Sequence, residues 1–173
     1  MRSSWLAKLV AGCLAVVALA ATPTALRAQS GATVLKPAET EKLIPATVFY
    51  RGQTAATQPR NSGGVRFADS YLVLASLVDT GGYSDAIVSR YQAVFIAEVP
   101  IKIAGKDLPA GVYGIGFLAG NKFLVTDIGG HDVLTADSAT DAALKLPLPL
   151  QVVADAAGGY RLYAGRRYVV LNR

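Results

Sequence analysis

Residues 112–127 carry the sequence VYGIGFLAGNKFLVTD, the clearest strand–turn–strand pattern in the chain. Two apolar runs flank Gly120-Asn121, a dipeptide that suits the two-residue turn of a β-hairpin. Counting outward from this turn pairs Phe117 with Leu124. The stretch therefore predicts an antiparallel hairpin.

This register divides the hairpin into a core face and a glycine face. The predicted core face holds Tyr113, Ile115, Phe117, Leu124 and Thr126. Gly114 and Gly116 lie on the other face, opposite Phe123 and Val125. Glycine at alternate strand positions leaves a shallow slot. We expect Phe123 or a neighbouring segment to fill this slot, and a ligand groove is the alternative.

A second hairpin is predicted at the C-terminal end of the chain. Residues 160–164 turn through Gly165-Arg166 into residues 167–172, and glycine first in the turn fits a type II′ geometry. This register places Tyr163 opposite Tyr168 as an aromatic cross-strand pair. The face expected to be buried holds Tyr160, Leu162, Val169 and Leu171.

Apolar stretches at short spacing extend the β pattern through the rest of the chain. Further strands are expected over residues 44–51, 65–68, 71–78, 91–98, 100–103, 131–136 and 148–154. The polar segment 52–64 is expected to be the longest loop. Short helices are expected over residues 37–42 and 84–90, and from Asp137 or Ser138 to Lys145. About eight strands with minor helix predict an all-β fold, either an antiparallel β-sandwich or a small barrel.

The first 28 residues predict a destination. Arg2 and Lys8 precede an unbroken apolar run over residues 9–21, and Ala28 offers a small residue for cleavage, an order typical of a secretory signal peptide. The run is shorter than the ~20 residues of a spanning helix, so we expect no transmembrane segment in the mature form. The expected organisation is a signal peptide over 1–28, a polar lead over 29–43 and a single β-rich domain over 44–173. The expected location is the periplasm, the cell surface or the extracellular space.

A lipoprotein signal is the alternative in the same segment. Val10 to Cys13 fits a lipobox, in which Cys13 would be lipidated. The apolar run continues beyond Cys13, whereas a lipobox normally closes it. Plain cleavage after Ala28 is therefore the favoured prediction.

Composition excludes several classes of function. The predicted leader holds three of the 17 basic residues and none of the 12 acidic ones, so residues 29–173 have a net charge of +2. This small charge, spread along the chain, does not form the basic patch that nucleic-acid binding requires. Cys13 is the single cysteine, which excludes disulfides and thiolate chemistry in the mature domain. His131 is the single histidine, which excludes metal sites built from two or three histidines. We therefore expect no metal and no cofactor.

The densest polar cluster lies in residues 127–132. Asp127 ends one predicted strand and His131 begins the next, so both are expected at one rim of the sheet. Asp127, His131 and Asp132 are the candidate catalytic residues, as a proton-transfer or weak metal site. The alternative, which we favour, is a glycine-rich turn whose carboxylates accept backbone N–H bonds.

The C-terminal hairpin is the candidate binding surface. Tyr163, Arg166, Arg167 and Tyr168 interleave aromatic and basic groups, a pattern that suits an acidic partner such as a lipid headgroup, a glycan or a protein surface. The alternative is that the arginines occupy solvated strand positions and protect a sheet edge.

One local motif resembles a known element. Residues 105–113 fit the form G-K-x-L-x-A-G-x-Y, in which Gly105-Lys106 turns one strand and Tyr113 re-enters the core. The segment is similar to a hairpin of small exported β-rich bacterial proteins of unknown function. The resemblance covers about 14 residues and implies a structural element without a catalytic residue.

These patterns favour an exported, non-catalytic β-domain with a binding or envelope accessory role. The expected partner is an envelope component, a glycan or a protein, and not a nucleic acid. The alternative function is an extracytoplasmic hydrolase whose acid and base are carboxylates, assisted by His131.

Overall fold

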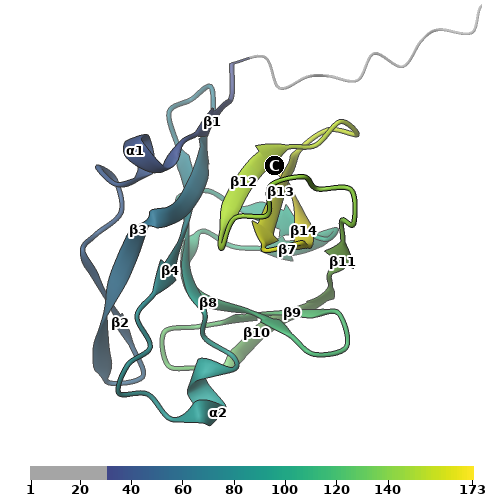
Figure 1. The fold of residues 1–173 in the computed structure, drawn as a ribbon. Coiled ribbons are helices and arrows are strands. Elements are labelled where there is room, and N and C mark those ends of the chain that lie inside the picture. The colour runs from purple at the N-terminus through teal and green to yellow at the C-terminus, as the bar shows by residue number, and fades with distance from the viewer. Residues whose placement is uncertain (1–30) are drawn as a thin grey trace, which may run out of the picture.

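The computed structural model describes residues 31–173, which form two antiparallel β-sheets and two short helices (Figure 1). The larger sheet has the order β1-β3-β4-β5-β8-β9-β10, with β2 beside β3. Its strands are β1 (Thr33–Leu35), β2 (Thr47–Tyr50), β3 (Gln53–Arg66), β4 (Leu72–Val78), β5 (Ala93–Ala97), β8 (Gly111–Leu118), β9 (Lys122–Thr126) and β10 (Asp132–Asp137). The predicted signal peptide and Cys13 lie outside the described residues.

The smaller sheet has the order β12-β13-β14-β6-β7, with β11 beside β14. Its strands are β6 (Ile101–Ile103), β7 (Lys106–Leu108), β11 (Ala139–Thr140), β12 (Gln151–Ala154), β13 (Tyr160–Ala164) and β14 (Arg167–Asn172). Neither sheet closes on itself, so the predicted all-β class is confirmed as a sandwich and not as a barrel. The described residues hold more strands than the eight expected, because several are only two or three residues long.

The main core lies between the two sheets. Phe95, Ile115 and Phe123 of the larger sheet share one cluster with Ile103 and Leu162 of the smaller sheet, and each is at most 1% exposed. Alternate residues of each strand point into this layer, which is how two sheets bury one face each. Helix α1 (Pro37–Thr40) lies beside β3, and α2 (Asp85–Val88) lies at the lower end of the molecule in Figure 1. No helix within residues 31–173 is long and apolar enough to cross a bilayer.

The predicted register of the 112–127 hairpin is wrong by one residue. Phe117 pairs with Phe123, and Leu118 pairs with Lys122. Phe123 therefore lies on the core face, while Leu124 faces the glycine side. A one-residue shift moves every side chain to the other face. Because residues 123–125 are all apolar and buried on both faces, alternation could not select the register.

The C-terminal hairpin has the predicted register. Tyr163 pairs with Tyr168 across the Gly165-Arg166 turn, and Gly165 has a positive φ of 61°. The expected apolar face is buried, with Leu162 and Val169 at most 2% exposed. Here one face alone is continuously apolar, so alternation and turn type agree.

Within the expected loop over residues 52–64, all residues from 53 onward belong instead to β3. Residues 53–56 pair with β2. Residues 57–58 and 62–66 pair with β4, on either side of an irregularity between Gln58 and Ser62, and residues 64–66 also pair with β1. The polar side chains find partners inside the fold: the Thr57 hydroxyl donates to the Pro45 carbonyl at 2.7 Å, and the Ser62 hydroxyl contacts that of Thr40. Satisfied hydroxyls can be buried at little cost, so low hydrophobicity did not indicate a loop.

Two further segments differ from expectation. The helix expected between Asp137 and Lys145 is absent, and β11 occupies part of that segment. The sheet also begins inside the predicted polar lead, because β1 pairs with β3 and Leu35 is buried. The helical turn expected near Pro37 is present as α1. Both differences depend on pairing with distant strands, which local composition does not encode.

Candidate functional site

The glycine face of β8 is covered by a neighbouring segment of the chain. A Cβ added to Gly114 would lie 2.8 Å from side-chain atoms of Tyr50 and Tyr91, and one added to Gly116 would overlap the carbonyl oxygen of Arg90. The two glycines thus allow β2 and the end of α2 to lie directly on the sheet. A neighbouring segment therefore fills the predicted slot, as expected, and Phe123 does not.

Three tyrosines hold this covering layer in place. The rings of Tyr50 and Tyr91 stack with centroids 3.8 Å apart, and the ring of Tyr83 meets both edge-on. The Tyr50 hydroxyl lies 3.0 Å from the Thr126 hydroxyl, and the Tyr83 hydroxyl donates to the Tyr50 carbonyl. Burial raises the pKa of the Tyr91 phenol well above its usual value. These neutral, packed rings make a rigid floor beneath α2 and the β2–β3 turn.

We expect Gly116→Ala to lower the free energy of unfolding by about 2 kcal/mol, because the added methyl group must displace the Arg90 backbone. Urea denaturation measures the change. The matched control is Gly81→Ala in an exposed turn, where the nearest atom is a side-chain oxygen of Asp79. Equal effects of the two substitutions would contradict the close packing of α2 on β8.

The β2–β3 turn places an arginine beside this layer. Arg51 and Gly52 form a two-residue connection with φ of 49° and 84°, the signs required by a type I′ turn. Such turns favour asparagine or glycine at the first position, so arginine there carries backbone strain. The Arg51 amide donates to the Ile128 carbonyl at 2.8 Å, which ties this turn to the β9–β10 connection.

The β9–β10 connection brings two of the three candidate catalytic residues together. The Asp127 carboxylate accepts a hydrogen bond from the His131 amide at 2.9 Å and lies 2.9 Å from Nδ1 of the same residue. These contacts, led by the amide bond, lower the pKa of Asp127. The His131 side chain is 83% exposed. The turn thus has the carboxylate–amide bonding that the favoured structural interpretation predicts.

The third candidate, Asp132, is directed to a different partner. Its carboxylate forms an ion pair with the guanidinium of Arg90, at the end of α2. Within residues 31–173, no group of three His, Cys, Asp or Glu side chains is close enough to hold a metal ion. The Asp127–His131 contact therefore stands as an exposed pair beside a separate Asp132–Arg90 pair.

A polar depression of about 360 Å³ opens where these segments meet. It is lined by Tyr50, Arg51, Ser84, Ala86, Ile87, Arg90 and Gly130. Two arginines from different elements line one hollow, and Ser84 makes no side-chain capping bond to α2. Within the described residues, no hydrogen bond, ion pair or ring contact engages the Arg51 guanidinium. The depression therefore offers hydrogen-bond donors with a positive charge.

Comparison of the chain with protein-family models, with curated proteins and with solved structures finds no match. The chemistry that the depression can perform therefore follows from its lining residues. Sequence reasoning missed Arg51, Ser84 and Arg90. The signal for Arg51 was present: an Arg-Gly dipeptide follows the strand residues Phe49-Tyr50 and forms a two-residue turn.

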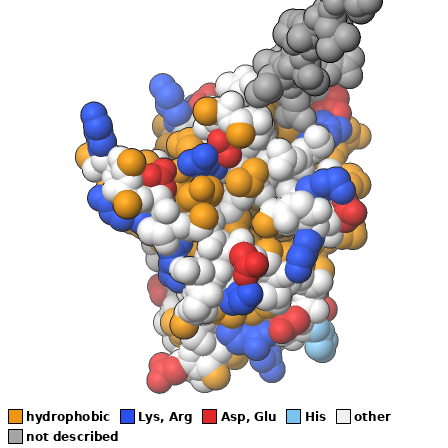
Figure 2. Space-filling view, turned by 90° about the vertical axis from the view of Figure 1, so that its right-hand side faces the viewer, with side chains coloured by type: hydrophobic (Ala, Val, Ile, Leu, Met, Phe, Trp, Pro, Cys, Tyr) orange, Lys and Arg blue, Asp and Glu red, His pale blue; other side chains and the backbone are white. Residues whose placement is uncertain are grey.

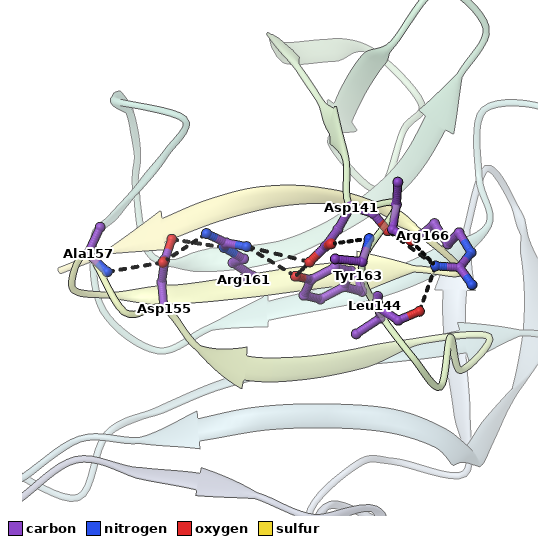
Figure 3. Close-up of polar contacts among 9 residues, drawn as sticks. Asp141, Leu144, Asp155, Ala157, Arg161, Tyr163 and Arg166 are labelled. Carbon is purple, nitrogen blue, oxygen red and sulfur yellow. Dashed lines mark hydrogen bonds and ion pairs between the residues drawn. The ribbon is translucent and has the colours of Figure 1, made fainter.

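The candidate binding residues of the C-terminal hairpin are largely engaged inside the protein (Figure 3). Tyr163 is buried, and its hydroxyl donates to the Asp141 carboxylate at 2.9 Å. The ring of Tyr168 lies 5.1 Å from that of Tyr163 and packs under the guanidinium of Arg161. The hairpin thus unites the two tyrosines as predicted, around an arginine that was not among the candidates.

Arg166 in the turn and Arg167 at the start of β14 both donate hydrogen bonds to backbone carbonyls. Arg166 donates to the carbonyls of Ala142 and Leu144, and Arg167 donates to those of Phe117 and Leu118. Figure 2 shows basic and acidic side chains interspersed over the face drawn there. A ligand role for Tyr163, Arg166, Arg167 and Tyr168 stays a prediction. A ligand response that is unchanged in the Arg166→Ser/Arg167→Ser variant would contradict it.

Proposed function

We propose that this chain is an exported, non-catalytic binding domain, an accessory protein of the envelope or extracellular space, and that the Arg51–Arg90 depression is its ligand site. The observation that carries the proposal is the Arg51 guanidinium, which lacks a partner within residues 31–173 and lines a depression of about 360 Å³. That volume falls in the range of small-molecule sites, about 300–1,000 Å³. The signal peptide expected in residues 1–28 supports export.

The electrostatics of the acidic residues favour binding over hydrolysis. A carboxyl group acting as general acid needs a raised pKa, so that it keeps its proton near neutral pH. The amide of His131 lowers the pKa of Asp127, and basic side chains lower those of Asp69, Asp137 and Asp155. Such carboxylates are suited to ion pairing rather than to proton donation.

His131→Ala tests the alternative hydrolase function. We expect the melting temperature to change by less than about 2 °C, because a single contact of an exposed side chain contributes little stability. Ligand-induced shifts in melting temperature should be the same as in the wild type. A hydrolytic activity of the wild-type protein that this variant loses would overturn the non-catalytic proposal.

A thermal-shift screen of the purified protein tests the binding function directly. The panel contains neutral and acidic sugars, peptidoglycan fragments, lipid headgroups and peptides, with chromogenic ester and glycoside substrates assayed in parallel. A ligand at about 100 times its dissociation constant adds about 2.7 kcal/mol of stability, which is a visible shift. Stabilisation by a panel member without turnover supports the proposal. Turnover, or an unchanged melt with every compound, overturns it.

A further inference from the structure

We infer that the Arg51–Arg90 depression recognises an oxyanion, a carboxylate or phosphate group carried by a small polar molecule such as an acidic sugar. This inference rests on the proposed binding function and names the chemistry of its ligand. A guanidinium presents a planar fork of N–H donors that matches the two oxygens of a carboxylate or phosphate. An oxyanion is therefore the ligand group that the lining best complements.

Several basic residues are engaged by partners inside the protein. Arg161 is paired with Asp155, Lys102 with Asp107, and Lys122 with Asp137. The turn arginines of the C-terminal hairpin bind carbonyl oxygens instead. Arg51 has neither type of partner within residues 31–173. Arg60 and Arg66 have no side-chain partner there either, but neither lines the depression, so it is the place of Arg51 in the wall of the hollow that points to a bound oxyanion.

The turn conformation at Arg51 recurs at a second place in the fold. Ala104 and Gly105 form a second two-residue turn with nearly the same φ values, 47° and 80°. Neither turn has the asparagine or glycine that would relieve strain at its first position. Alanine carries the same strain at Ala104 without a functional side chain, so this second turn serves as a matched control for Arg51.

The β9–β10 turn directs the Arg51 side chain across the surface. A Cβ added to Gly130 would lie 2.5 Å from Cδ of Arg51, so the absence of a side chain at Gly130 makes room for the arginine stem. Both residues line the depression. The Arg51 side chain is exposed, but its stem lies against Gly130 and contributes to the wall of the hollow.

Ser84 and Arg90 supply further donors at the two ends of α2. Arg90 is paired with Asp132, but the two side chains are 44% and 56% exposed, so this pair is weak and exchangeable. Its guanidinium can contact a ligand oxyanion in place of Asp132, together with the Ser84 hydroxyl. Ala86 and Ile87 provide apolar contact for the body of the ligand.

Matched hexoses test the inference by calorimetric titration of the full purified protein. The probes are D-glucuronate, D-glucose 6-phosphate and neutral D-glucose, with inorganic phosphate as the isolated anion. We expect at least one acidic hexose to bind about tenfold or more tightly than D-glucose, because charge-assisted hydrogen bonds require the anion. Tighter binding of D-glucuronate indicates a carboxylate ligand, and tighter binding of D-glucose 6-phosphate indicates a phosphate ligand. Raising the salt concentration should weaken its binding.

Arg51→Asn separates ligand binding from folding. Asparagine suits a positive φ, so this variant should melt at the wild-type temperature or higher while binding the acidic hexose about tenfold or more weakly. The control is Ala104→Asn, which introduces the same residue at the equivalent position of the second turn and should leave binding unaltered.

The outcomes separate the inference from the proposed function. Wild-type affinity of Arg51→Asn for the acidic hexose overturns the oxyanion inference. Equal binding of D-glucose and the acidic hexoses overturns it as well, while leaving the binding function in place. If none of the four probes binds, the inference falls, and the wider screen decides the binding function separately.

Discussion

Replacing Phe123 with alanine is expected to lower the free energy of unfolding by about 4 kcal/mol. Phe123 is fully buried in the main core, and its ring meets that of Phe117 edge-on with centroids 4.8 Å apart. Removal of the ring leaves a cavity between two sheets that cannot collapse easily. The midpoint of urea unfolding, with an unchanged slope, measures the loss.

The control for this substitution is Phe49→Ala. Phe49 is 54% exposed on β2, so its replacement should change the free energy of unfolding by less than about 0.5 kcal/mol. The comparison also tests the register of β8 and β9, which places Phe123 on the core face. Equal losses in the two variants would contradict that register.

Arg161→Ala is expected to lower the free energy of unfolding by about 3 kcal/mol. Its guanidinium donates two hydrogen bonds of 3.0 Å to the carboxylate of Asp155, whose side chain is only 5% exposed (Figure 3). The variant leaves that carboxylate buried without its cation, which is costlier than the loss of a surface pair. Lys102→Ala, which removes the exposed pair with Asp107, is the control and should change stability little.

The pH dependence of stability provides a second readout of this pair. The hydrogen bonds from Arg161 lower the pKa of Asp155 below its ordinary value of 3.8. A carboxyl with a depressed pKa in the folded state contributes stability that is complete above its unfolded pKa and is lost as the pH falls through its folded value. The difference between wild type and Arg161→Ala should therefore be largest near neutral pH and shrink as the pH falls through the pKa values of Asp155 in the two proteins. A difference that persists unchanged in acid would show that the loss arises from packing alone.

Local patterns located the candidate site only in part. Asp127 and His131 were expected at one rim, and they do contact each other, because both flank a single tight turn. Arg51 and Arg90 are 39 positions apart in the chain. They line the same depression because Gly114 and Gly116 allow the Tyr50–Tyr91 stack and the end of α2 to lie on β8. No local pattern around either arginine contains that information.

The sequence by itself determined the all-β class, both hairpins and the register of the C-terminal one. The apolar face of Tyr160, Leu162, Val169 and Leu171, with glycine first in the turn, favoured the pairing of Tyr163 with Tyr168 that the structure shows. Tertiary structure alone decided the register of the 112–127 hairpin, because apolar residues on both faces of β9 made two registers equivalent locally. It also decided that residues 53–66 form a strand, since the energy of burying their polar groups depends on partners far away in the chain. The depression formed by the Arg51 turn, α2 and the Gly130 turn is likewise a product of packing between distant segments.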